Sequence, residues 1–208
     1  MEESVDMESR IIEAAKKVFV RKGFDATKMS DIAAEVGIGR TALHYYFRTK
    51  EMLFDAIFGQ LIGKLLPNIG RIVDDDSTIL EKMPKLVEQY TSTVYENPYF
   101  PIFAVQEINR DSEHLFRTVM KEPERLQPIL RLQQQIKDEM EKGLLKKMPL
   151  IDVASTLVSL VVFPTLIREP LTVILLDGNV SQFDEFLFRR KTLVTEVMIR
   201  LLTPDSKE

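Results

Sequence analysis

Residues 28–50 read KMSDIAAEVGIGRTALHYYFRTK, and this stretch determines the fold predicted for the start of the chain. It predicts a helix over about 29–36, a tight turn at Gly37 and a second helix over about 40–47. Gly37 can adopt the left-handed backbone conformation that a sharp turn needs, and the small Ala33 lets two helices approach closely. The apolar anchors between the helices are then Ile38, Leu43 and Phe47.

The second helix of this motif keeps a polar face for a partner, formed by Arg40, Thr41, His44 and Tyr45. A helix of this kind fits the major groove of DNA, with its N-terminal residues at the base edges. Arg40 can make a bidentate contact to guanine, worth ~1–3 kcal/mol of discrimination. Lys50 begins the next helix, where an ammonium and backbone N–H groups can meet a phosphate.

The rest of the chain favours an all-α fold, because apolar residues recur at helical spacing and no segment reads as a strand. All ten prolines lie at Pro67 or later. The proline-free first 66 residues therefore form one region, and the longer remainder of the chain forms a second. Besides the motif, we expect helices over about 9–22, 50–66, 78–96, 98–109, 111–120, 124–142, 150–168 and 181–202. The acidic stretch GRIVDDDST at 70–78 is expected to be a connection, and LDGNV at 176–180 a loop.

Composition excludes several kinds of site. The chain has 208 residues, no cysteine and two histidines, which excludes disulfides, thiol nucleophiles, iron–sulfur clusters and His-rich metal sites. Asp111, Glu113 and His114 are poorly spaced for a metal on one helix face, so we expect no metal and no cofactor. No nucleophile elbow, phosphate loop, Glu-x-x-His pair or thiol is present, so an enzyme is not expected.

Charge is unevenly distributed. The chain carries a net charge of −4, yet residues 9–64 hold ten Lys/Arg against six Asp/Glu, which indicates a local contact with a polyanion. The acidic, polar N-terminus does not read as a secretory signal, so a cytoplasmic location is expected. The apolar run 150–167 is interrupted by polar residues and Pro164, and we interpret it as a buried or interface helix with no membrane contact.

Residues 8–66 resemble the DNA-binding domain of the tetracycline-repressor (TetR) family of bacterial regulators. The resemblance rests on IIEAAKKVFVRKGF at 11–24, MSDIAAEVGIGRTALHYYF at 29–47 and KEMLF at 50–54. It implies an N-terminal three-helix domain whose helix-turn-helix motif covers about 29–48. It also implies DNA contacts by Lys28, Ser30, Gly39, Arg40, Thr41, His44, Tyr45, Tyr46 and Lys50. Residues 67–204 match only in architecture, as a helical ligand-binding and dimerisation domain.

Three positions depart from the family pattern. Lys28 stands where Ser or Thr often caps the first motif helix, and Thr27 is expected to take over that cap. Gly39 replaces a Ser that commonly caps the recognition helix. His44 replaces a Tyr used against the DNA backbone, which predicts a mild pH dependence of binding.

The resemblance also implies an effector pocket near the sequence NPYFP at 97–101, where prolines disrupt packing. The expected lining residues are Tyr90, Tyr95, Tyr99, Phe100, Phe103, Gln106 and Phe116. Helices 150–168 and 181–202 are expected to pack against their copies in a homodimer. Two recognition helices would then read a pseudo-palindromic operator in double-stranded DNA, with half-sites roughly 34–36 Å apart or a multiple of that.

The sequence therefore predicts a transcriptional repressor that a small apolar or amphipathic ligand releases from its operator. The alternative is a DNA-binding regulator that a protein partner controls, with no small-molecule effector.

Overall fold

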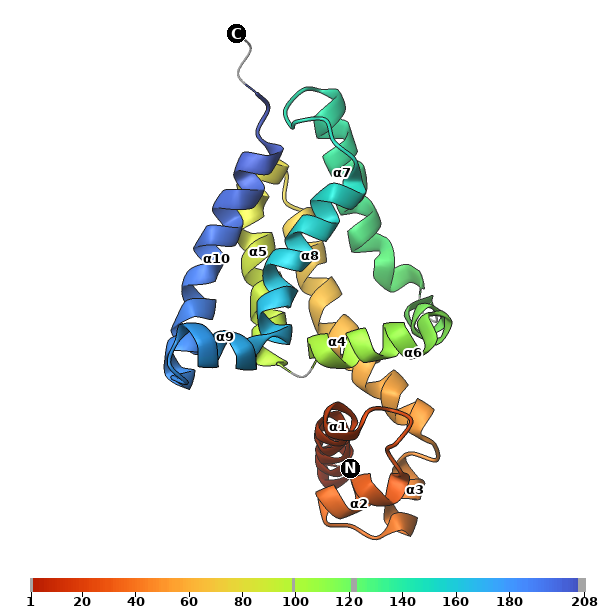
Figure 1. Ribbon diagram of the computed structural model, residues 1–208. Coiled ribbons are helices and arrows are strands. Elements are labelled where there is room, and N and C mark those ends of the chain that lie inside the picture. Colours follow the sequence, from red (N-terminus) through yellow and green to blue (C-terminus); the bar gives the residue numbers. More distant parts are fainter. Residues whose placement is uncertain (1, 99, 121–122, 206–208) are drawn as a thin grey trace. The chain divides into compact units, whose positions relative to one another are not determined.

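The computed structural model describes residues 2–98, 100–120 and 123–205, and within these ranges the chain is all-helical (Figure 1). The all-α expectation is thus confirmed. The elements are α1 (Glu2–Lys22), α2 (Met29–Val36), α3 (Arg40–Tyr46), α4 (Lys50–Val73), α5 (Ile79–Glu96), α6 (Phe100–Met120), the 3₁₀ helix η1 (Pro123–Leu126), α7 (Gln127–Glu141), α8 (Leu150–Leu166), α9 (Arg168–Leu175) and α10 (Val180–Leu202).

The chain forms two compact units. The first contains residues 1–63 together with 98–122, and the second contains 64–97 together with 123–208. This division differs from the sequence-based domains 8–66 and 67–204, because α6 belongs with the N-terminal helices. Periodicity shows that α6 has an apolar face, but it does not show which core receives that face.

The core of the first unit forms where α1, α2, α3 and α4 meet. Phe19, Leu43 and Phe54 are fully buried, and Phe47 is nearly so. Ala33 is 4% exposed at the close approach between α2 and its neighbours, and Ile38 packs against the same cluster. The expected anchors of the helix-turn-helix are therefore confirmed.

The turn between α2 and α3 has the geometry that the sequence predicts. Gly37 adopts φ 81° and ψ 31°, in the left-handed region where a side chain is unfavourable. Its N–H donates to the carbonyl oxygens of Ala33 and Ala34, which closes the last turn of α2. The chain can then reverse within three residues and start α3 at Arg40.

The second unit is built around α5 and α10, with α8 packed against both. Ile79, Val87, Val161, Val194, Met198 and Leu202 are almost completely buried in this core. Thr78 and Glu81 form the capping box expected at the start of α5: the Thr78 N–H donates to Glu81 Oε2 at 2.8 Å and the Glu81 N–H donates to Thr78 Oγ1 at 3.4 Å. The hydrogen bond from the Thr78 backbone lowers the pKa of Glu81 below its usual value.

Several elements differ from the sequence-based expectations, beginning with α1, which starts at Glu2 and not near Ser9. Helix α4 continues through Pro67 to Val73, whereas we expected it to end near Leu66. Helix α9 was not expected at all. The expected helices 98–109 and 111–120 are the two parts of α6, which meet at a non-helical Asp111 with φ −157° and ψ 80°.

Among the described residues, no single helix is long and apolar enough to cross a membrane. Helices α8 and α9 meet the length and composition criteria only when taken together, and they are bent by 69° relative to each other.

Candidate nucleic-acid interface

Helix α3 presents a polar face on the opposite side from its buried anchor. Leu43 is 0% exposed, whereas Tyr45 is 84% exposed. Arg40 and Thr41 are exposed in the first turn of the same helix. Since Leu43 fixes the rotation of α3 in the core, the three outer side chains are held in the arrangement that a DNA-reading helix requires.

Within this face, Arg40 and His44 are linked one helical turn apart. Arg40 Nε donates to His44 Nε2 at 3.3 Å. The two terminal nitrogens of the guanidinium are the ones that form a bidentate contact with guanine, so this bond orients Arg40 without using them. Tyr45 and Tyr46 contact edge to face at 5.3 Å between ring centroids, and Tyr46 also packs against the first core.

The start of α2 is capped differently from our expectation. Thr27 Oγ1 donates to the carbonyl oxygen of Gly23 at 2.7 Å, so the expected Thr27 cap on α2 is wrong. The helix is capped from inside instead, because the Lys28 N–H donates to Asp31 Oδ2 at 3.0 Å. This backbone bond, followed by the Lys22 ammonium at 3.0 Å, lowers the pKa of Asp31. The Lys28 and Ser30 side chains are exposed beside this cap.

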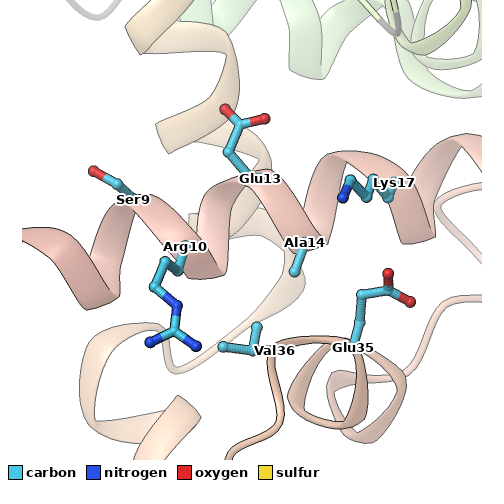
Figure 2. Close-up of a pocket in the computed structure, with 7 residues that line it drawn as sticks. All are labelled: Ser9, Arg10, Glu13, Ala14, Lys17, Glu35 and Val36. Atoms are coloured by element: carbon cyan, nitrogen blue, oxygen red, sulfur yellow. The ribbon is translucent and has the colours of Figure 1, made fainter.

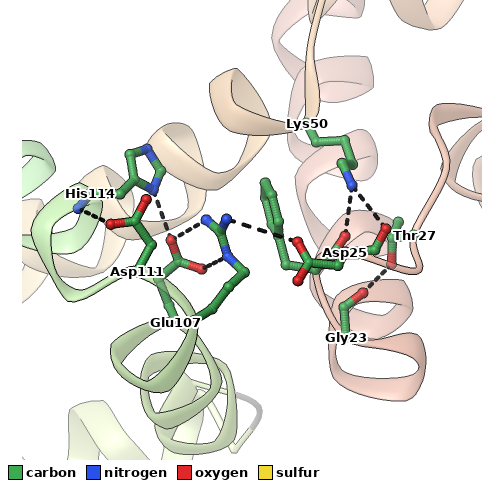
Figure 3. Close-up of polar contacts among 9 residues, drawn as sticks. Gly23, Asp25, Thr27, Lys50, Glu107, Asp111 and His114 are labelled. Atoms are coloured by element: carbon green, nitrogen blue, oxygen red, sulfur yellow. Dashed lines mark hydrogen bonds and ion pairs between the residues drawn. The ribbon is translucent and has the colours of Figure 1, made fainter.

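Lys50 points toward the turn between α1 and α2 (Figure 3). Its Nζ donates to the carbonyl oxygens of Phe24 at 2.9 Å and Asp25 at 3.2 Å, and lies 4.7 Å from the centroid of the Phe24 ring. An ammonium has three donors, so one remains for a phosphate. Lys50 therefore secures this turn, and its phosphate contact stays a prediction.

An open groove of about 330 Å³ lies between α1 and the end of α2. Figure 2 shows Arg10 and Lys17 on α1 above Glu35 and Val36 on α2. Glu35 forms an ion pair with Arg21 at 3.0 Å. The groove has charges of both signs, and no group of three or more metal-ligating side chains is gathered anywhere in the described ranges.

The seven residues expected to line an effector pocket lie in different environments. Tyr90 and Tyr95 pack against the second core, whereas Phe103 is 4% exposed within the first core and Phe100 packs against it. Gln106 is half-buried, Phe116 is 63% exposed, and Tyr99 lies outside the described residues.

A second groove, of about 410 Å³, is lined by the α4–α5 connection and α7. None of the seven expected lining residues borders this groove or the one beside α1. Its wall includes Glu139, which accepts from the Ile79 N–H at about 3.0 Å and from Gln135 at 2.7 Å. Gln135 in turn accepts from the buried Lys82 at 2.8 Å, so these polar groups satisfy one another.

Sequence reasoning missed a polar cluster on α6. Glu107 and Arg110 were not singled out, and His114 was considered only as a metal ligand. Glu107 is 1% exposed and contacts both Arg110 and His114. The signal available in the sequence was the i, i+3 spacing of Glu107 and Arg110, which is common on exposed helix faces and so did not indicate burial.

Comparison with known proteins identifies the first unit. Residues 11–57 match the family described as bacterial regulatory proteins, tetR family. Residues 11–57 therefore form a domain of the tetR family. Over 128 residues the chain is 27% identical to YhgD, an uncharacterised HTH-type transcriptional regulator of Bacillus subtilis (strain 168), with 57% of this chain and 67% of YhgD covered.

Two further matches extend this picture. The HTH-type nicotine-responsive transcriptional repressor HdnoR of Paenarthrobacter nicotinovorans is 30% identical over 76 residues, which cover 36% of this chain and 39% of HdnoR. A crystal structure of a TetR family transcription regulator from Marinobacter aquaeolei VT8 superimposes with a TM-score of 0.71 at 16% identity, covering 99% of this chain and 100% of that one. That likeness shows the fold of the whole chain.

The sequence matches to other curated relatives are partial. The chain covers 34% of the Bacillus subtilis regulator YfiR, for example, although it is 44% identical to YfiR over 70 residues. The family consists of transcription regulators. With this domain at its start, the chain is a DNA-binding transcriptional regulator, and α3 is the second helix of its helix-turn-helix.

Proposed function

We propose that this protein is a homodimeric repressor that a small amphipathic ligand releases from a pseudo-palindromic operator. The polar face of α3 carries the DNA part of the proposal. Arg40, Thr41 and Tyr45 are exposed on a helix whose opposite side is fixed in the core. The further contacts that we propose are Lys28, Ser30, Gly39, His44, Tyr46 and Lys50, each of which is exposed or half-buried.

The ligand part of the proposal rests on Tyr95. Its hydroxyl is buried and has no hydrogen-bond partner in the described part of the chain. An unpaired buried hydroxyl is costly, so a bound molecule that accepts its hydrogen bond gains affinity at this position. Burial raises the pKa of Tyr95, against the opposing charge of Arg190, and raises that of Tyr90 to about 12. Both hydroxyls are therefore neutral donors at neutral pH.

Apolar surroundings suit an amphipathic ligand at this position. Tyr90 and Tyr95 lie beside the apolar core of the second unit, so a molecule reaching the Tyr95 hydroxyl would meet mostly carbon. HdnoR, which is named for its response to nicotine, provides a precedent for a small-molecule effector among the relatives.

The ligand proposal predicts the behaviour of Tyr95→Phe. This variant removes only the hydroxyl, so we expect unchanged operator affinity without ligand. The effector concentration for half-release should rise about 2- to 13-fold, the worth of one hydrogen bond. The measurement is release of labelled operator DNA by compounds from a small-molecule library. Ser112→Ala, which removes an exposed hydroxyl on α6, is the control, and we expect no change in its response to effector. Equal release of wild type and Tyr95→Phe by every active compound would contradict this role for Tyr95.

A dimer interface is proposed on α8, α9 and α10, which expose large apolar side chains. They are Ile151, Val158, Phe163, Val173, Ile174, Leu175, Val180, Phe188 and Leu193. These three helices contact one another, and so much exposed apolar surface favours a protein contact. A second copy of the chain satisfies the two-fold symmetry that a palindromic operator needs. Helix α9 thus adds to the interface expected from the sequence.

The dimer proposal predicts that Phe188→Glu raises the dimer dissociation constant about 30-fold or more, since it places a charge within an apolar contact. Phe188 is 72% exposed, so the folded monomer tolerates the change. Sedimentation velocity across a dilution series measures the effect. Leu130→Glu on α7, at a side chain 52% exposed, is the matched control and should remain dimeric. Identical sedimentation of the two variants would contradict the interface.

A further inference from the structure

We propose that Glu107 and Arg110 on α6 are positioning residues for DNA binding: they hold the turn between α1 and α2 and thereby set the orientation of the helix-turn-helix. The proposal rests on the DNA-binding function proposed above. In this role the two residues affect DNA binding without contacting DNA themselves.

Glu107 is the buried centre of the cluster. Its side chain is 1% exposed, and Arg110 binds it with both arms of the guanidinium, Nε donating to Oε2 at 2.8 Å. The His114 ring donates from Nδ1 to Oε1 at 2.8 Å, because a carboxylate can only accept. A buried carboxylate is stable only with such partners, so Glu107 fixes the rotamers of both neighbours.

Arg110 extends from Glu107 to the turn that leads into α2. Its guanidinium lies 4.0 Å from the centroid of the Phe24 ring, and a terminal nitrogen lies 3.9 Å from Asp25 Oδ1. Because Asp25 is largely exposed, the stacking on Phe24 and the bond to Glu107 carry most of this contact.

The same turn is held from the other side by the start of α4. Lys50 donates to the Phe24 and Asp25 carbonyl oxygens, and Thr27 donates to that of Gly23 (Figure 3). Residues 23–28 are the chain connection into the helix-turn-helix. Arg110 and Lys50 together therefore immobilise the segment that positions α2, and through the Gly37 turn α3.

The second part of α6 is fastened to α4. His114 Nε2 lies 3.6 Å from Asp55 Oδ1, and Thr118 Oγ1 donates to the same oxygen at 2.8 Å. The His114 ring also lies 5.0 Å from that of Phe54, between centroids. At the break in α6, Asp111 Oδ1 accepts from the His114 N–H at 2.9 Å. Since both ends of the cluster are anchored within the first unit, Arg110 has a fixed base from which to hold the turn.

Without Arg110 the turn allows more orientations of α2 and α3 in the free protein. DNA binding then loses affinity, because these helices must be ordered when the complex forms. We expect Arg110→Gln and Glu107→Gln each to weaken binding to a fixed operator fragment at least threefold. Both changes break the same interaction, the pair between Glu107 and Arg110. The double variant should therefore bind DNA about as well as the weaker-binding single variant. Arg131→Gln, which breaks an ion pair with Asp74 in the second unit, is the matched control and should not change affinity.

The test is fluorescence anisotropy of labelled operator DNA at several salt concentrations, with thermal melting of every variant. Loss of a residue that binds phosphate makes the slope of log affinity against log salt shallower by about 1, as we expect for Lys28→Gln. Arg110→Gln should weaken binding with the slope unchanged, at a temperature where the variant is folded. A change in slope, an additive double variant or unaltered affinity in Arg110→Gln would each overturn the proposal.

Failure of this inference is distinguishable from failure of the proposed function. If wild type binds its operator and Arg110→Gln binds it equally well, only the positioning role fails. If wild type binds no DNA fragment, the repressor proposal fails and the positioning role fails with it.

Discussion

Replacing Arg40 with alanine is expected to weaken operator binding by about 5- to 150-fold at each half-site, the range that corresponds to ~1–3 kcal/mol for a bidentate contact to guanine. Arg40 is exposed at the start of α3, and His44 orients it through Nε while the terminal nitrogens stay available. We expect the loss to be specific: the variant should no longer distinguish the operator from one substituted at the contacted base pair.

Competition between the two DNA sequences measures this effect. The stability of the variant should change by no more than ~0.5 kcal/mol, as for other surface substitutions, because Arg40 contributes nothing to the core. Arg71→Ala, at an exposed arginine of α4 in the second unit, is the matched control and should retain wild-type affinity. Equal affinity of Arg40→Ala and wild type for the operator would contradict the proposal that α3 reads bases through Arg40.

Replacing Phe103 with alanine is expected to destabilise the first unit by about 3–5 kcal/mol. Phe103 is 4% exposed, and its ring centroid lies 4.7 Å from that of Phe54 and 5.8 Å from that of Phe19. Its removal leaves a cavity among aromatic side chains that cannot easily close. A pocket residue in contact with solvent would instead be replaceable at little cost in stability.

Urea unfolding followed by circular dichroism measures this change. Phe116→Ala lies on the same helix at a side chain 63% exposed, and it should alter the free energy of unfolding by no more than ~0.5 kcal/mol. Similar unfolding of the two variants would show that Phe103 does not support the N-terminal core.

The helix-turn-helix could be predicted from the sequence because its determinants are local. Gly37, Ala33 and Leu43 act within one short segment, where their spacing determines the turn, the close approach and the buried side. The exposed face of α3 follows directly from that assignment. The capping box at Thr78 and Glu81 was predictable for the same reason.

Long-range packing could not be predicted in this way. Phe103 and Phe100 lie in an aromatic sequence that fits a pocket or a core equally well, and only contact with Phe19, Phe54 and Phe58 decides between them. The burial of Glu107 likewise depends on helices about 50–100 residues away in the chain. The cap expected from Thr27 was wrong because a Thr hydroxyl can either accept from a backbone N–H of the following helix or donate to a preceding carbonyl. Here it donates to the carbonyl oxygen of Gly23.

We propose above that this chain reads a specific DNA sequence with α3. Selection of genomic DNA fragments by the purified protein, stripped of bound small molecules and followed by salt titration on the best fragment, tests it most directly. We expect a short inverted repeat with half-sites one or more helical turns apart, bound with an affinity that falls steeply with salt and depends on Arg40. Failure to enrich any fragment, even at low salt, would contradict it.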